Sequence, residues 1–163
     1  PQYREALKID GLTNLRIAVI GRQGNLFPVF NRTVGLGKWT VSGPEAAPDH
    51  PLELALDDDI NSFYQSKGPF AKGSEVRLDF DAPKTLSGIK VVAAQGVYGG
   101  RSHFIRSGRL LTSADGETFV EAAKFANGVA EFKGPAKPVK AIRIVADETV
   151  EPALRIREIF LSR

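Results

Sequence analysis

The chain has 163 residues, of which 42% are hydrophobic and 25% charged, and its formal net charge is +3. This length and balance are ordinary for a single globular domain. No apolar run approaches the roughly 18 residues of a membrane span. The basic residues are mixed with acidic ones along the chain, which argues against a nucleic-acid-binding surface.

The chain contains no cysteine, which rules out disulfides and thiol catalysis. This absence says little about the compartment, because a domain of this size can be stable without a disulfide. The first residue is Pro1 rather than methionine. We therefore expect a processed protein or a piece of a longer one, in which a signal peptide would not be visible.

Short runs of alternating apolar residues dominate the chain after residues 3–9, which are expected to form a short helix or the end of a linker. In the clearest run, Val76, Leu78 and Phe80 share one face. Gly, Pro and Asp separate the runs, and residues 114–117 are expected to turn. The expected strands are 15–20, 75–80, 88–94, 109–113, 118–123, 129–132, 140–145 and 154–161. Many short strands with almost no helix predict an all-β fold, an antiparallel sandwich.

Residues 54–66 combine three consecutive carboxylates, Asp57 to Asp59, with neutral oxygen-bearing side chains and two aromatic residues. Adjacent carboxylates repel one another, so such a cluster either faces water or is neutralised by a hard cation. An EF-hand does not fit, because counting from Asp57 places Ser62 and Gly68 where that loop needs Gly and Glu. An exposed acidic turn and a calcium site both remain open.

The last expected strand contains a misplaced carboxylate. Period-two alternation puts Glu158 on the apolar face of Ile156, whereas Ile159 and Leu161 fall on the opposite face. Either a bulge near Arg157 resets the register, or Glu158 points inward and needs a partner. In the second case, Glu158 would supply a carboxylate to a buried cation.

Four groups of segments, in order along the chain, resemble the discoidin domain, also called the coagulation-factor type C domain. They are residues 34–42, 55–66, 76–91 with 110–119, and 140–144 with 154–159. Residues 55–66 are similar to the family's Ala-x-Asp-Gly…Thr-x-Trp-x-Ser pattern. The resemblance implies a galactose-binding-like jelly-roll β-sandwich over residues 34–163. Residues 1–33 would then be a linker and an N-terminal extension that packs on the sandwich.

The resemblance also implies a structural calcium ion, because carbohydrate-binding members of the family commonly hold one. Asp58 stands where the family usually has Gly, although Asp can adopt a left-handed conformation at modest cost. Ser62 replaces the commoner Thr. Carried over by position, the calcium ligands are Leu54, Asp57, Asp59, Ser62, Arg157 and Glu158, with Leu54 and Arg157 acting through their carbonyl groups.

Residues 95–108 join two apolar strands through a loop that is long for a hairpin and rich in glycine. Sugars are bound by aromatic faces and by planar polar groups on loops held by a rigid scaffold. We therefore expect ligand contacts from Tyr98, Arg101, His103, Phe104 and Arg106. The alternative is a surface loop in which Phe104 plugs the core and the Arg and His residues are solvated.

Other aromatic and basic residues have expected places. Trp39 and Tyr64 are predicted to lie in the core, and Lys67 and Phe70 to border the acidic loop. His50 lies in a polar, Pro-rich loop and is expected to be solvated. No catalytic residue is predicted, because the chain has neither a Gly-x-Ser-x-Gly elbow nor a His-Glu-x-x-His motif.

The resemblance implies a non-catalytic carbohydrate-binding module that tethers an attached glycosidase to a glycan, with galactose- or N-acetylhexosamine-type sugars as ligands. Such modules are often appended to bacterial glycosidases, including chitobiase- or hexosaminidase-like enzymes. A secreted, periplasmic or cell-surface location is therefore implied. The alternative is a structural or protein-interaction module that binds no sugar. We expect a monomer without nucleic-acid partners.

Overall fold

The computed structural model describes residues 13–17, 30–34, 37–93, 97–98 and 101–163. The described residues contain one short 3-10 helix, η1 (Leu52–Leu56), and the rest of the regular structure is strand. The strands are β1 (Thr13–Ile17), β2 (Phe30–Val34), β3 (Trp39–Ser42), β4 (Tyr64–Gln65), β5 (Glu75–Ala93), β6 (Val97–Tyr98), β7 (Arg101–Ser102), β8 (Gly108–Ser113), β9 (Val120–Lys124), β10 (Val129–Ala146) and β11 (Arg155–Ser162). The antiparallel all-β sandwich is confirmed.

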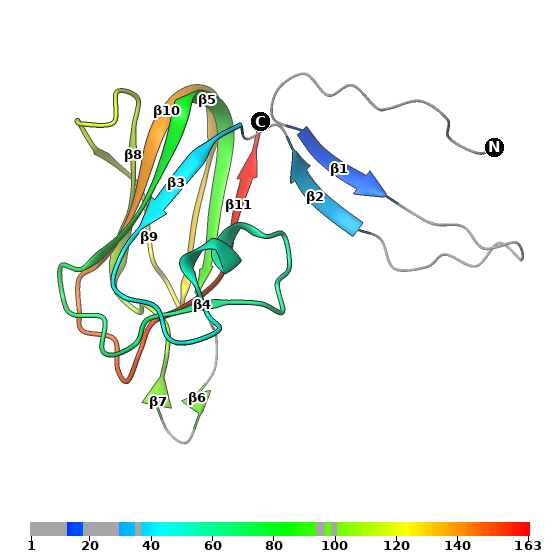
Figure 1. Cartoon of the computed structure of the whole chain (residues 1–163). Coiled ribbons are helices and arrows are strands. Elements are labelled where there is room, and N and C mark those ends of the chain that lie inside the picture. The colour runs from blue at the N-terminus through cyan, green and yellow to red at the C-terminus, as the bar shows by residue number, and fades with distance from the viewer. Residues whose placement is uncertain (1–12, 18–29, 35–36, 94–96, 99–100) are drawn as a thin grey trace, which may run out of the picture.

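Two long strands, β5 and β10, build both layers of the sandwich (Figure 1). Residues 75–80 of β5 pair with β3 and with residues 141–145 of β10, which in turn pair with β8. We call this layer, completed by β9, sheet I. Residues 88–93 of β5 pair with β11 and with residues 129–133 of β10, and β4 extends β11. We call this layer sheet II.

The sequence suggested four separate strands where the structure has these two continuous ones. Prolines near residues 83 and 135–138 predicted breaks, because proline lacks the amide proton that a strand ladder uses. The structure instead keeps the pairing across the prolines and shifts the register between Lys133 and Lys137 and between Val139 and Ala141. Such irregularities let a strand turn a corner without ending.

The core fills the space between the two sheets. In sheet I, Val76 lies in register with Ile144, and in sheet II Val91 lies in register with Ile159, and all four side chains are buried. Tyr64 is fully buried and donates its hydroxyl to the Pro44 carbonyl oxygen at 3.1 Å. Trp39 is partly buried and packs against the core. Both aromatic residues therefore lie where the sequence placed them.

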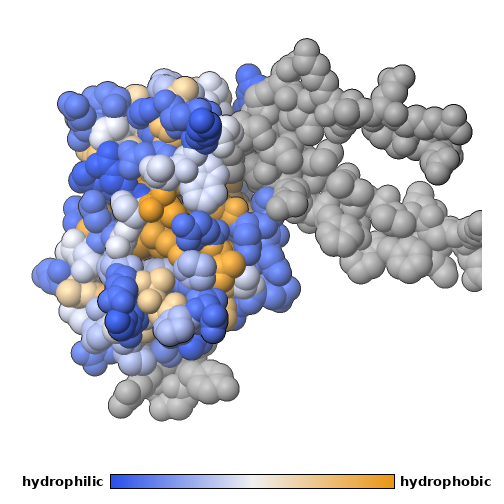
Figure 2. Space-filling model, viewed as in Figure 1, coloured by the Kyte–Doolittle hydropathy of each residue, from blue (hydrophilic) through white to orange (hydrophobic). Residues whose placement is uncertain are grey.

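The outer surface is largely hydrophilic, with an apolar area near the middle of the face in Figure 2. This area lies where β3 and η1 meet, and Val41 and Leu56 there are only partly buried against the core. Edge strand β3 pairs only with β5, so η1 closes this side of the sandwich. Within the described residues, no helix has the length and apolar character needed to cross a membrane.

The turn between β8 and β9 lies where it was predicted and is organised by Asp115. The Asp115 Oδ1 atom accepts hydrogen bonds from Ser113 Oγ at 2.7 Å and from the Glu117 and Thr118 amides at 2.8 Å each. These bonds hold the pKa of Asp115 well below its ordinary range. Gly116 follows with a φ of 90°, a conformation that suits glycine.

We expect Asp115→Ala to lower the melting temperature by about 2–4 °C at neutral pH, because three donors lose their acceptor. A lowered folded-state pKa means that the carboxylate stabilises the protein above its ordinary pKa of 3.8 and stops doing so as the pH falls toward the folded value. The difference between wild type and variant should therefore be constant above about pH 5 and shrink in acid. Thermal melts from pH 2 to pH 8 measure it. A difference that grows in acid would contradict this role.

Candidate functional site

An oxygen cluster surrounds Ser62 in the acidic turn that follows η1. The Ser62 Oγ atom lies 2.8 Å and 3.0 Å from the two Asp57 carboxylate oxygens, 2.9 Å from the Asp59 carbonyl oxygen and 3.2 Å from the Leu54 carbonyl oxygen. A serine hydroxyl has one proton, so it satisfies only one of these four acceptors at a time. The Ser62 hydroxyl is therefore surrounded by more acceptor oxygens than its single proton can bind.

The three consecutive aspartates play different parts in this turn. Asp57 Oδ1 also accepts the Asp59 amide at 2.9 Å. The Asp59 carboxylate accepts the Asn61 amide at 2.9 Å and the Asn61 Nδ2 at 3.0 Å, so Asp59 offers the cluster its carbonyl oxygen. Asp58 has a φ of 63°, the left-handed conformation expected from a position where the family uses Gly.

A bulge at Arg157 resolves the anomaly of the last strand. The register of β11 on β5 shifts between Ile156 and Glu158, which returns Ile159 to the core face with Ile156. Glu158 thereby falls on the outer face of sheet II, opposite Val92. Glu158 is nevertheless only 1% exposed, because the acidic turn covers it.

The Glu158 carboxyl is an incompletely satisfied group. Its Oε1 accepts the Ile159 amide at 3.1 Å, whereas its Oε2 is buried and has no hydrogen-bond partner. The pKa of Glu158 is raised to about 8, mainly by burial and also by the nearby negative charges of Asp58 and Asp57, while hydrogen bonds from the Ile159 and Asp58 amides oppose the shift. A buried carboxyl beside other carboxylates lacks a positive partner.

Of the six residues predicted as metal ligands, five lie in or against the acidic turn, and Arg157 contacts it through its side chain. Four belong to the acidic turn, and the Asp58 amide joins the turn to Glu158. Arg157 adds a second link, because its Nη1 donates to the Ile60 carbonyl oxygen at 3.0 Å. Among the described residues, no three His, Cys, Asp or Glu side chains are already grouped around one point as metal ligands. A cation bound here would rely on carbonyl and hydroxyl oxygens as well as carboxylates.

The predicted sugar loop contains the β6–β7 hairpin, in which Tyr98 pairs with Arg101. The side chains of these two residues lie outside the described part of the structure. His103 is 8% exposed, and its Nδ1 lies 3.0 Å from the Ala153 carbonyl oxygen. Phe104 packs on the core and against Gly128, as in the alternative of a core plug. Arg106 is exposed. Of the three described side chains, Arg106 alone is thus freely accessible.

A cluster that sequence reasoning missed lies beside this loop. The rings of His50 and Phe63 stack with centroids 4.2 Å apart and planes inclined by 15°. The guanidinium groups of Arg155 and Arg157 lie 4.9 Å and 5.8 Å from the Phe63 ring centre. We call His50, Phe63, Arg155 and Arg157 the aromatic–arginine cluster. The prediction that His50 is solvated was wrong, because the ring is half-buried and its Nδ1 lies 3.1 Å from the Phe63 carbonyl oxygen.

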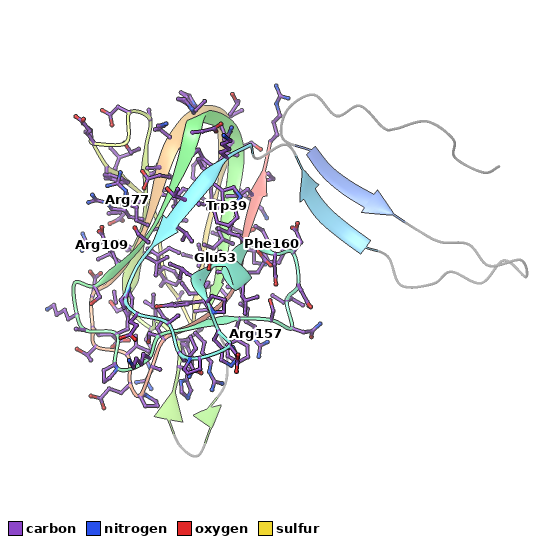
Figure 3. The ribbon with its side chains drawn as sticks, in the orientation of Figure 1. Trp39, Glu53, Arg77, Arg109, Arg157 and Phe160 are labelled. Carbon is purple, nitrogen blue, oxygen red and sulfur yellow. The ribbon has the colours of Figure 1, made fainter. Side chains whose placement is uncertain are left out.

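Backbone pairing places this cluster and the predicted loop at the same end of the sandwich. The Arg155 amide donates to the His103 carbonyl oxygen at 2.9 Å, and Arg155 lies in register with Gln65 of β4. The Arg155 Nε also donates to Gln65 Oε1 at 2.7 Å, which fixes its guanidinium near Phe63. Figure 3 shows the labelled Arg157 near β4, on the side of the molecule away from Arg109. All four cluster residues are partly exposed.

Two further predictions concerned the rim of the acidic loop. Phe70 is completely buried, so the prediction that it lines a surface was wrong. It belongs to the core because its backbone pairs with Val150, at 3.0 Å and 2.9 Å, and this pairing turns the ring inward. Lys67 is exposed and forms an ion pair with Glu45 at 2.6 Å.

Comparison with known proteins adds a family and a fold. The model of the F5/8 type C domain matches residues 38–159. None of the curated proteins compared with the chain matches it. The structure is similar to module CBM32-1 from a family 31 glycoside hydrolase of Clostridium perfringens, with a TM-score of 0.63 and 17% identity over 77% of this chain and 94% of the other.

Two further similar structures from the same organism contain a sugar. The family 32 CBM of NanJ, in complex with galactose, has a TM-score of 0.60 and 19% identity over 76% of this chain and 92% of that one. The fifth CBM32 module of a family 89 enzyme, in complex with GalNAc-β-1,3-galactose, has a TM-score of 0.58 and 16% identity over 79% of this chain and 96% of that one. At these identities the likeness shows the fold.

Proposed function

The chain belongs to the F5/8 type C domain family, and from that premise we propose that it is a non-catalytic carbohydrate-binding module whose sugar site is the loop end of the sandwich. The aromatic–arginine cluster carries this proposal. An aromatic ring offers a surface to the C–H face of a sugar, and arginine offers planar donors to its hydroxyls. Arg155 is held in place by Gln65, so a ligand meets a pre-organised group.

We propose galactose- or N-acetylgalactosamine-type sugars as ligands. The solved structures of similar fold include a module in complex with galactose and another in complex with GalNAc-β-1,3-galactose. In this chain, the partly exposed His50, Arg155 and Arg157 would supply the polar contacts around Phe63. Tyr98, Arg101 and Arg106 of the neighbouring loop would complete the site.

We further propose that residues 34–163 form the module of a longer secreted, periplasmic or cell-surface glycosidase, with residues 1–33 as a linker and extension. The likeness to a module from a family 31 glycoside hydrolase supports an attached catalytic domain. A chitobiase- or hexosaminidase-like parent remains our proposal. In such a protein, the module would keep the catalytic domain close to the glycan and raise the local substrate concentration.

The test is sugar binding by calorimetry and on immobilised glycans, with wild type, Arg155→Ala and Phe63→Leu. We expect each variant to raise the Kd for N-acetylgalactosamine or galactose at least about tenfold, which corresponds to about 1.4 kcal/mol, because a few aromatic and arginine residues carry most of the binding energy of a site. Arg109→Ala is the control, since Arg109 is also partly exposed but pairs with Asp147 on the β8 side. Melting curves verify that each variant folds.

Retention on no glycan would defeat the proposal and favour the alternative, a structural or protein-interaction module. Equal loss in the Arg109→Ala control would also count against it, because the effect would then not be local to the cluster. Loss in Tyr98→Ala or Arg101→Ala with no loss in Arg155→Ala would move the site from the cluster into the hairpin. His103→Ala is less informative, since the buried His103 contacts Ala153 and its removal would disturb the loop.

We propose in addition that the acidic turn binds a structural calcium ion. Calcium prefers six to eight oxygen ligands, and the oxygens around Ser62 together with the unpartnered Glu158 Oε2 fit this preference. The ligands would be Leu54, Asp57, Asp59, Ser62, Arg157 and Glu158. The ion would supply the positive charge that the buried carboxyl lacks, and it would tie the last strand to the turn.

A further inference from the structure

A small hollow lies on the outer face of sheet II, away from the loop end. Its volume is about 140 Å³. Three strands form it, and its walls are Gly88, Ile89, Lys90, Glu131, Phe132, Lys133, Phe160 and Ser162. The hollow therefore belongs to the regular framework of β5, β10 and β11 rather than to a loop.

Strand register explains why a hollow forms at this place. Phe160, Lys90 and Glu131 lie side by side across the three strands, and Ser162, Gly88 and Lys133 form the next row on the same face. Gly88 has no side chain, and a Cβ atom there would collide with Ser162 Oγ. The Ser162 hydroxyl lies over Gly88 instead of a larger side chain, so the floor between the aromatic ring and the charged groups stays low.

The walls are mainly apolar and include an exposed aromatic ring, and donors and acceptors lie at the rim. Phe160 is 40% exposed and is one of three large exposed hydrophobic residues among those described. Figure 3 places it on β11, on the flank opposite Arg77 and Arg109. The Lys133 ammonium lies 2.8 Å from Glu131 Oε1, which fixes a donor and an acceptor at the rim. Lys90 and the Ser162 hydroxyl add further polar groups.

We propose that this hollow is a second sugar-binding site that takes a single pyranose unit. An apolar cavity of about 150 Å³ admits a ring as large as benzene, so the hollow has room for one six-membered ring. A pyranose presents an apolar C–H face, which Phe160 would cover, and hydroxyls that both donate and accept, which match Lys90, Glu131 and Ser162. At the floor of the hollow, β5 is paired on both sides, so an extended peptide cannot add to this strand there.

The inference rests on the proposed function only for its ligand class, because it concerns different residues on a different face. Two sites on one module allow a branched or long glycan to be held at both, and the joint affinity then exceeds that of either site. Isolated monosaccharides bind each site separately. Amide chemical shifts, recorded during titration with galactose and with N-acetylgalactosamine, report the two sites independently.

We expect saturable shifts at the amides of Lys90, Glu131 and Ser162 in the wild-type chain. Phe160→Ala should weaken this set at least about tenfold and leave the shifts at the loop end unchanged. The double variant Gly88→Ala with Ser162→Ala puts a methyl group in place of the Ser162 hydroxyl at the floor, without the collision that Gly88→Ala alone would cause, and it should weaken the same set. Val120→Ala is the control, since Val120 is 56% exposed on β9 of sheet I.

The outcomes separate this inference from the loop-end proposal. Shifts confined to the loop end, or shifts at Lys90 and Glu131 that persist in both Phe160→Ala and the double variant, overturn the second site. In the wild-type chain, shifts at the hollow with none at the loop end support the hollow and reject the loop-end site. Shifts at the hollow that survive Arg155→Ala, while the loop-end shifts are lost, support both sites. Titration of both sugars without any shift rejects both. Melting temperatures show that the variants are folded.

Discussion

Chelation of calcium should lower the melting temperature of this chain by roughly 5–10 °C relative to a sample with calcium about 100-fold above its Kd. A ligand at that excess stabilises the folded state by about 2.7 kcal/mol, and each kcal/mol shifts the melting temperature of a domain of this size by about 2–4 °C. The physical reason is the acidic turn, where Glu158 Oε2 is buried without a partner beside Asp57 and Asp58.

Glu158→Gln provides the specific variant for this experiment. Its amide cannot replace the charge of the carboxylate, so the variant should melt at nearly the same temperature with calcium and with chelator. Asp49→Asn is the matched control, because Asp49 is an exposed aspartate with a φ of 62° outside the cluster, and asparagine tolerates that conformation. It should retain the full response to calcium. An unchanged melting temperature of the wild type in chelator would reject the site.

Glu158 shows how much the alternation of apolar residues along one strand predicts about the burial of a side chain. The pattern of Ile156, Ile159 and Leu161 already required either a bulge or an inward carboxylate. The structure contains the bulge, yet Glu158 is buried all the same, because the acidic turn covers the outer face of the strand. Alternation reports which residues share a face, but it contains no information about what later covers that face.

The aromatic–arginine cluster could not be predicted from the sequence either, because it depends on contacts between segments far apart in the chain. His50 and Phe63 are close along the chain, but Arg155 reaches them only through the pairing of β11 with β4. In the sequence, Arg155 and Arg157 flank Ile156 as ordinary outward-facing strand residues. The one available signal was that Arg155 and Arg157 share the polar face of the last expected strand.

The two long strands, β5 and β10, are continuous where the sequence predicts breaks. Prolines near residue 83 and at 135–138 predict breaks, whereas the structure has strands at the expected places that continue past these prolines. At these positions, pairing continues through shifts of register at the corner of the sandwich, where β5 and β10 pass from one sheet to the other (Figure 1). Whether a proline ends a strand depends on the partner strand, which the local sequence does not contain.

Phe70→Ala should be the most destabilising single change among the aromatic residues considered for binding. Phe70 is fully buried, and removal of a buried phenylalanine side chain costs about 3–5 kcal/mol, which corresponds to a loss of roughly 10 °C or more. The paired backbone groups of Phe70 and Val150 are retained in the variant, so the loss measures the ring. Denaturant unfolding gives the free energy, and melting gives the temperature.

Phe160→Ala is the comparison of the same residue type, because 40% of Phe160 remains in water and its loss should cost on the order of 1 kcal/mol. The two variants should therefore have opposite effects on stability and on sugar binding. Phe70→Ala loses stability and, where it is still folded, keeps sugar binding, whereas Phe160→Ala keeps most of its stability and loses the shifts at the hollow. Loss of sugar binding by Phe70→Ala at a temperature where the variant is fully folded would contradict the assignment of Phe70 to the core alone.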